Sequence, residues 1–161
     1  MTELTERSDL PGSASVLPRG VRRRLRTNRV WRRWAAGWVG GAALGIVNGV
    51  VRDLLYKDRA GDLTAHQIST GTLIALLTLY FWILERRWPI PSRRSAFVIG
   101  GTWLALTVLF EFAFGHYVDG KSWSNLLENY DIADGHVWIL VLIWVALGPA
   151  GMREFTVRRR A

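Results

Sequence analysis

The chain contains no cysteine, which excludes a disulfide framework, a thiolate nucleophile and a cysteine-ligated zinc site. The GxSxG, GxGxxG, SxxK and HExxH arrangements are missing as well, so the common hydrolases, dinucleotide enzymes and zinc proteases have no motif support. Lysine is scarce, because 19 of the 21 basic residues are arginine. Any chemistry therefore depends on histidine, aspartate, glutamate, serine or tyrosine.

Long apolar stretches dominate the rest of the sequence. Half of the 161 residues are hydrophobic, nine are tryptophan, and the formal net charge is +8. Stretches without charged residues alternate with short polar segments, and a stretch of about 17 or more apolar residues is long enough to cross the hydrocarbon core of a bilayer. The sequence therefore predicts a membrane bundle rather than a compact water-soluble domain.

Four apolar stretches fit membrane-spanning helices, at residues 34–51, 68–84, 95–115 and 137–152. The expected fold is all-α, a polytopic membrane protein with a bundle of four transmembrane helices. The last stretch is short, and Gly148 followed by Pro149 predicts a distorted final turn. A small-residue cleavage site of the A-x-A type does not follow the first stretch, which favours a retained helix over a signal peptide.

Polar, basic segments flank the predicted bundle. Residues 1–33 are expected to form a disordered tail, and residues 153–161 a second basic tail. Eight arginines fall between Arg19 and Arg33. Directly before a spanning helix, such a run is typical of a cytoplasmic flank or of binding to anionic lipid headgroups, and a nucleic-acid partner is the less favoured alternative.

The basic residues divide unequally between the two sides of the predicted bundle. Seventeen of them lie in the two tails and in the turn after the second span. Only Arg52, Lys57, Arg59 and Lys121 lie on the other side, among seven acidic residues. The positive-inside rule then places both termini in the cytoplasm and the two remaining connections outside.

Aromatic residues agree with these boundaries. Trp34, Trp88 and Trp123 fall at predicted membrane surfaces, where amphipathic rings are favoured. In the segment SWSNLLENY, apolar residues recur at helical spacing from Trp123 to Tyr130, behind Ser122 as a candidate N-cap. The second outer connection is therefore expected to contain a short helix lying on the membrane surface.

Four glycines, Gly37, Gly41, Gly45 and Gly49, recur at every fourth position of the first span. They form three overlapping GxxxG units on one helix face, a pattern typical of close helix packing in lipid. The neighbour that packs on this strip is either another span of the same chain, which is favoured, or a second copy in a homodimer.

Three polar residues are expected to share one outer layer of the membrane. Asn48 and Arg52 lie near the outer end of the first span, and Glu111 is at a comparable height in the third. An ionised carboxylate facing lipid is costly, so Glu111 is expected to turn inward. In the structural alternative Glu111 pairs with Arg52 and fixes helix register, while Asn48 hydrogen-bonds across the glycine strip.

The functional alternative depends on the histidines. His66, His116 and His136 all lie at outer boundaries of the predicted spans, where they and nearby carboxylates could bind a divalent metal or titrate protons. Their spacing matches no ligand motif, so a metal site is disfavoured and no cofactor is expected. Glu111 with His66 or His116 is a candidate acid-base pair for chemistry on a lipid or envelope substrate.

Three segments carry a family resemblance, GIVNGVVRDLLY, AHQISTGTLIALL and FEFAFGHYVDGKSWSNLLENYDIADGHVWILVLIW. Over residues 34–149 the chain resembles a family of small bacterial four-span integral membrane proteins that has no assigned activity. The resemblance implies a location in the bacterial cytoplasmic (inner) membrane. It also implies a single feature formed by Asn48, Arg52, His66, Ser69, Glu111, Gly115 and Trp123.

The sequence is compatible with three functions. The favoured one is a non-enzymatic binding or accessory component, whose outer polar cluster holds a lipid headgroup, a small solute or a membrane-protein partner. The second is an outer-interface enzyme, with Glu111 as acid or base and Arg52 holding an anionic group. The third is a proton-linked small transporter, because an ionisable residue inside a span is a functional candidate. The polar cluster comprises Asn48, Arg52, His66, Ser69, Glu111 and His116.

Overall fold

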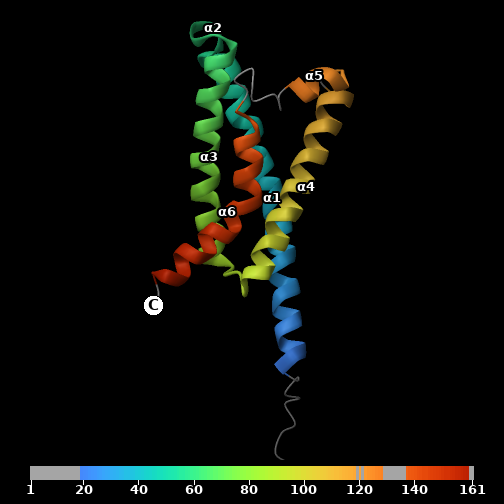
Figure 1. The fold of residues 1–161 in the computed structure, drawn as a ribbon, viewed down its shortest axis with the longest axis vertical. Coiled ribbons are helices and arrows are strands. Elements are labelled where there is room, and N and C mark those ends of the chain that lie inside the picture. The colour runs from blue at the N-terminus through green and yellow to red at the C-terminus, as the bar shows by residue number, and fades with distance from the viewer. Residues whose placement is uncertain (1–18, 119, 121, 129–136, 160–161) are drawn as a thin grey trace, which may run out of the picture.

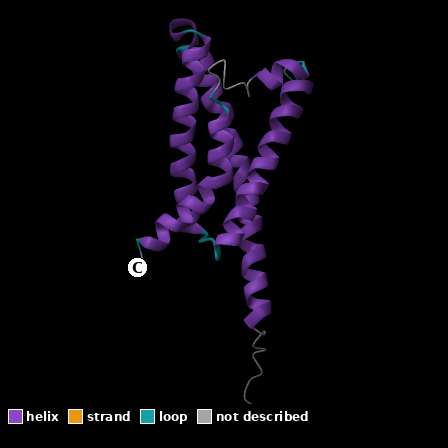
Figure 2. Cartoon of the chain, viewed as in Figure 1, coloured by secondary structure: helices purple, strands orange, loops and turns teal. Residues whose placement is uncertain are grey.

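The structure is a computed structural model that describes residues 19–118, 120, 122–128 and 137–159. No strand forms in this described part of the chain (Figure 2), so the all-α prediction is confirmed. Its helices, in chain order, are α1 (Arg19–Leu55), α2 (Lys57–Ala60), α3 (Asp62–Arg87), α4 (Arg93–Tyr117), α5 (Trp123–Glu128) and α6 (Ile139–Arg158).

Four of these helices, α1, α3, α4 and α6, are long and apolar enough to cross a membrane. They run between two ends of the bundle (Figure 1). The arginine-rich end carries the start of α1, the α3–α4 turn and the end of α6, whereas the opposite end carries α2 and α5. The prediction of a four-span bundle is therefore confirmed.

The first helix is longer than the predicted span, because α1 begins at Arg19 and not at Trp34. The expectation of a disordered tail does not hold for residues 19–33, and residues 1–18 lie outside the described residues. Arginine has a high helix propensity, so a helix already formed by the span extends readily into this segment. The 37 residues reach about 55 Å, and the start of α1 projects past the bundle (Figure 1).

The next two spans also exceed their predicted bounds. α3 starts at Asp62, directly after Gly61, whose φ of 78° ends α2. α4 starts behind Ser92, whose Oγ accepts a hydrogen bond from the backbone N–H of Ser95 at 3.1 Å as an N-cap. Hydropathy marks where a helix enters hydrocarbon, whereas caps and turns decide where the helix ends.

The last span continues through Pro149 to Arg158, so most of the predicted basic tail, residues 153–161, is helical. Proline lacks a backbone N–H and its ring crowds the carbonyl four residues earlier, which bends a helix. α6 changes direction toward its end (Figure 1). The distortion predicted at Pro149 is thus a bend within a longer helix.

Trp103 lies at the centre of the packed core. It is 1% exposed, and its ring lies 5.0 Å from the Phe81 ring and 6.3 Å from the Trp34 ring. Its indole N–H donates to the backbone carbonyl of Trp34 at 2.9 Å. Gly41 makes room for it, because a Cβ there would lie 2.6 Å from Cζ3 of the indole. This side chain of α4 thereby joins α1 and α3.

Small residues let α4 and α6 approach closely. A Cβ at Gly100 would overlap the carbonyl oxygen of Ala146, so the two backbones are in direct contact. A Cβ at Gly148 would lie 2.6 Å from a ring carbon of Phe81. Toward the opposite end, α4 leans away from the other spans and carries α5 (Figure 1). The bundle is therefore tight near the arginine-rich end and splayed near the opposite end.

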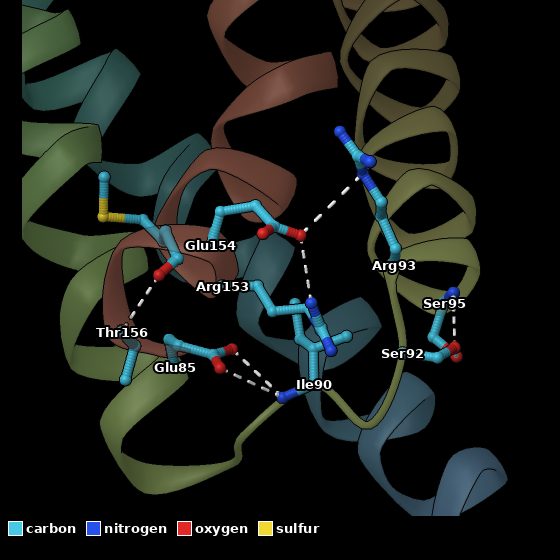
Figure 3. A network of polar contacts seen from close by, with 9 residues as sticks. Glu85, Ile90, Ser92, Arg93, Ser95, Arg153, Glu154 and Thr156 are labelled. Carbon is cyan, nitrogen blue, oxygen red and sulfur yellow. Dashed lines mark hydrogen bonds and ion pairs between the residues drawn. The ribbon is translucent and has the colours of Figure 1, made fainter. Parts of the chain in front are cut away.

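A polar network closes the arginine-rich end of the bundle (Figure 3). Glu85 is buried at the end of α3, where its carboxylate accepts hydrogen bonds of 3.1 and 3.3 Å from the backbone N–H of Ile90. On α6, Glu154 pairs with Arg153 at 3.1 Å and with Arg93 of α4 at 3.8 Å. These contacts fix the α3–α4 turn against α6, which holds the spans together at this end.

Candidate functional site

The structure divides the predicted polar cluster into three parts and a separate His116, all near the opposite end of the bundle. The first part joins α1 to α3 through two buried residues, Asn48 and Ser69. The side-chain amide of Asn48 donates to the backbone carbonyl of Ser69 at 2.9 Å and to its hydroxyl at 2.6 Å. In lipid-facing helices such a contact fixes the height of one helix against the other.

We expect Asn48→Ala to lower the free energy of unfolding by about 1 kcal/mol, because both hydrogen bonds to Ser69 are lost. Ser69→Ala removes one of the two bonds and should cost less. Reversible unfolding in mixed micelles with increasing SDS, followed by far-UV circular dichroism, measures both losses. A loss no larger than that of Val47→Ala, on the lipid-exposed face of the same helix, would contradict the role of Asn48.

Arg52 forms the second part together with Asp53 and His66. Its guanidinium contacts the Asp53 carboxylate at 2.9 and 3.3 Å and lies 3.1 Å from Nδ1 of His66. Because a guanidinium only donates, His66 accepts through Nδ1. The ion pair considered between Arg52 and Glu111, both described residues, does not form, because Asp53 and His66 hold the guanidinium on the α1–α3 side.

Glu111 belongs to the third part, on the inner face of α4. One carboxylate oxygen accepts a hydrogen bond from the indole N–H of Trp138 at 2.9 Å. The Trp138 ring also packs edge-on against the His66 ring, with centroids 6.4 Å apart. Trp138 therefore links Glu111 to the Arg52 and His66 pair without direct contact between the charged groups.

Sequence reasoning missed Trp138. It directly precedes α6, at the same end of the bundle as Glu111, and an indole N–H at a membrane boundary is a common donor to a carboxylate. The position of Trp138 at a predicted membrane boundary was therefore the signal in the sequence that could have pointed to it. The sequence contains nine tryptophans. The packing of α4 against α6 decides which of them reaches Glu111, and this packing leaves no local pattern in the sequence.

His116 packs against α5. Its ring stacks on Trp123 at 4.1 Å between centroids with an interplanar angle of 23°. Next to it, Leu126 is buried against Gly115, where a Cβ would lie 2.5 Å from Cδ2 of Leu126. The predicted short helix thus forms as α5, and these two contacts attach it to the end of α4.

A metal site finds no support in the described geometry. No group of three or more His, Asp or Glu side chains gathers anywhere in the described residues. His66 contacts Arg52, His116 contacts Trp123, and His136 lies outside the described residues. In the described part of the chain, the two histidines that were predicted as alternative partners of Glu111 therefore contact different side chains.

Between the spans lies a cavity of about 280 Å³. Its back wall is formed by buried side chains of α3 and α6, among them Leu77 and Val145. Glu111 and Trp138 lie in its wall. Glu111 is the only charged side chain among the described residues that line it. The site is thus an apolar cavity that carries one carboxylate.

The glycine strip of α1 serves two purposes. Gly37 faces Leu84, and Gly41 faces Trp103, with would-be Cβ distances of 3.2 and 2.6 Å. Gly45 lines the cavity and, like Gly49, would place a Cβ with no other atom within 4 Å. Among the described residues, close packing on this strip is therefore confined to its half near the arginine-rich end, and Gly45 contributes empty space instead.

Sequence reasoning also missed one motif, since GHYVDGKS from Gly115 to Ser122 matches the GxxxxGK[ST] spacing of phosphate-binding loops. In those loops the motif follows a strand, and its backbone wraps around the phosphates before a helix. Here Gly115 lies inside α4 and packs against Leu126, and Lys121 lies outside the described residues. The described part of the motif has no such context, so the match carries no argument for nucleotide binding.

Comparisons with protein-family models, with curated proteins and with solved structures give no match for this chain. The resemblance to small bacterial four-span proteins therefore stays a prediction. The fold itself defines a class, because four helices have the length and composition to cross a bilayer. The chain is a multi-pass membrane protein with a largely apolar cavity between its spans.

Proposed function

We propose that the chain is a non-enzymatic component of the bacterial cytoplasmic membrane that binds a small apolar or amphiphilic molecule between its spans. The observation that carries this proposal is the cavity of about 280 Å³, in whose apolar wall Glu111 is the one carboxylate among the described residues. Ligand sites are typically concave and mostly apolar, with a few polar groups that fix the orientation of the ligand.

The size of the cavity supports a small ligand. An engineered apolar cavity of about 150 Å³ is large enough to bind benzene, and typical ligand sites begin at about 300 Å³. A volume of about 280 Å³ accommodates one hydrocarbon chain segment or one small ring system. The two chains of a complete diacyl lipid need more space than this.

Binding is favoured over acid-base chemistry by the positions of the histidines. A general acid-base pair needs both groups within hydrogen-bond reach of the reacting atoms. Glu111 lines the cavity, but neither His66 nor His116 does. Proton-linked transport is also disfavoured. Between the two ends of the bundle, α3 presents Leu73, Leu77 and Phe81 to the core, and these apolar side chains cannot relay protons.

The distribution of arginine supports the orientation that is part of this proposal. Exposed arginines lie on the start of α1, at the α3–α4 turn and at the end of α6, for example Arg29, Arg87 and Arg158. The positive-inside rule puts this end in the cytoplasm, where the arginines interact with anionic lipid headgroups. The cavity and α5 then belong to the outer half of the membrane.

The proposal predicts that Gly45→Phe abolishes ligand binding. The phenyl ring fills the cavity, and its Cβ meets no other atom within 4 Å, so the helix accepts the substitution. The full chain in lipid nanodiscs is incubated with decylamine, decanol or decane, and retained probe is counted by native mass spectrometry. We expect at least one probe at one copy per chain in the wild type and none in Gly45→Phe.

Gly49→Phe is the matched control, because it adds the same ring one turn further along the same face. Gly49 also has no atom within 4 Å of a would-be Cβ, but it does not line the cavity. This variant should retain the probe as the wild type does. If no probe stays on the wild type, or if both variants lose it equally, the cavity is not a binding site.

A further inference from the structure

The class of the ligand and its route into the cavity both rest on the proposed binding function. We infer that the cavity takes a single-chain amphiphile with a protonated amine as its polar group. The amphiphile enters sideways from the bilayer, between α1 and α4. Its amine pairs with Glu111, and its chain extends toward the middle of the membrane.

The mouth of the cavity lies between α1 and α4. The lining residues with the greatest exposure are Ile46 of α1, at 47%, and Phe114 of α4, at 38%. By contrast, lining residues from α3 and α6, such as Leu77 and Val145, are buried. Because α1 and α4 are both spans, this mouth faces hydrocarbon rather than water. A ligand that uses it must first dissolve in the bilayer.

The two ends of the mouth are closed by side-chain contacts. Nearer the arginine-rich end, the indole N–H of Trp38 donates to Thr107 at 3.1 Å, and the Trp38 ring packs on Phe110 at 5.9 Å. At the other end, Leu126 of α5 is buried on Gly115 and lines the cavity. α5 therefore covers the cavity where it approaches the membrane surface, and the lateral mouth lies between these two closures.

The chemistry of the lining selects the polar group. Glu111 supplies hydrogen-bond acceptors and a negative charge, and no lysine or arginine is among the described lining residues. A carboxylate offers about four hydrogen-bond acceptor positions. A protonated amine donates up to three hydrogen bonds, and the opposite charges of the two groups strengthen these bonds. A phosphate or carboxylate headgroup would be repelled.

The height of Glu111 matches the way an amphiphile lies in one leaflet. Glu111 is six residues before Tyr117, the last residue of α4, and so lies about 9 Å from the end of the helix. The apolar wall formed by Gly41, Leu77 and Trp103 lies deeper in the bundle. A headgroup at Glu111 therefore remains near the membrane surface while the chain follows the cavity inward.

The headgroup is tested with the full chain in nanodiscs and with decylamine, decanol, decanoic acid and decane as probes. We expect decylamine to be retained most strongly, decanol less, and decanoic acid least. In Glu111→Gln the affinity for decylamine should fall about tenfold or more, as the loss of a charge-assisted hydrogen bond predicts, while decane is unaffected. Glu154→Gln, at the arginine-rich end, is the control and should bind decylamine as the wild type does.

The outcomes separate the ligand class from the proposed function. If Gly45→Phe abolishes binding but Glu111→Gln leaves decylamine unchanged, or decanol and decane bind as well as decylamine, the cavity binds chains and the amine assignment is wrong. If no decyl probe is retained by the wild type, the proposed function itself falls. If Glu111→Gln and Glu154→Gln lower the affinity for decylamine equally, the loss reflects the net charge of the protein and not the cavity. That result also overturns the amine assignment.

Lateral entry has its own test, because the chain lacks cysteine and a single introduced thiol can be labelled specifically. Ile46→Cys and Val47→Cys place a thiol at adjacent exposed positions of α1, of which only the first lines the cavity. A bulky maleimide at residue 46 should slow uptake of decylamine by about tenfold or more, and the same label at residue 47 should not. Equal uptake in the two labelled proteins would overturn entry between α1 and α4.

Discussion

Trp103→Ala is expected to lower the free energy of unfolding by about 3–5 kcal/mol, the range measured when a large buried aromatic side chain is truncated. Trp103 is 1% exposed, and its ring contacts both Trp34 and Phe81. Truncation leaves a void between three spans and removes the donor from the backbone carbonyl of Trp34. Unfolding in mixed micelles by SDS, followed by far-UV circular dichroism, gives the difference from the wild type.

Two variants show which part of Trp103 is responsible. Trp103→Phe keeps most of the ring contact but loses the indole N–H, so its cost should be about 1–2 kcal/mol. Trp31→Ala removes the same type of side chain where it is 40% exposed, and should cost less than about 1 kcal/mol. Equal losses at Trp31 and Trp103 would mean that the aromatic contacts of the core do not hold the spans together.

The number and order of the spans could be predicted from the sequence because hydropathy alone determines them. A stretch that crosses hydrocarbon must be apolar and must satisfy its backbone hydrogen bonds as a helix. The ends of the helices could not be predicted in the same way. Residues 19–26 precede the candidate span, which begins at Thr27, but they are helical as a continuation of α1, and only helix propensity signals this.

The site could be predicted only in part. The cost of exposing a carboxylate to lipid required Glu111 to face inward, and the structure places it on the cavity wall. Its partner could not be derived, because opposite charge favoured Arg52 whereas the fold brings Trp138 to Glu111. Arg52 instead reaches the neighbouring Asp53 and His66. Which residues meet depends on the tilt of α4 against α6, and this tilt is set by contacts far from the site.

Those distant contacts also explain why the cavity exists. Near the arginine-rich end, Trp103 and Gly100 bring α4 close to α1, α3 and α6. Toward the opposite end α4 leans outward (Figure 1), and Gly45 lacks a side chain that would fill the resulting space. Tight packing at one end and missing side-chain volume at the other together produce a cavity beside Glu111.

Gly100→Val is expected to destabilise the bundle by about 3 kcal/mol or more, the upper range for overpacking a core. A Cβ at Gly100 overlaps the carbonyl oxygen of Ala146 and lies 2.9 Å from its carbonyl carbon. These are backbone atoms of α6 and cannot rotate away, so α4 and α6 must separate. Separation also changes the distance between α4 and α6 at the cavity, so the variant should lose decyl probes in nanodiscs as well as stability.

Gly101→Val is the matched control for this prediction. It introduces the same β-branched side chain at the next position of α4, so both variants carry the same change in helix propensity. A Cβ at Gly101 meets no other atom within 4 Å, and its loss of stability should stay within about 1 kcal/mol. Equal losses at the two positions would show that α4 and α6 do not touch at Gly100, and the tilt that opens the cavity would then need another cause.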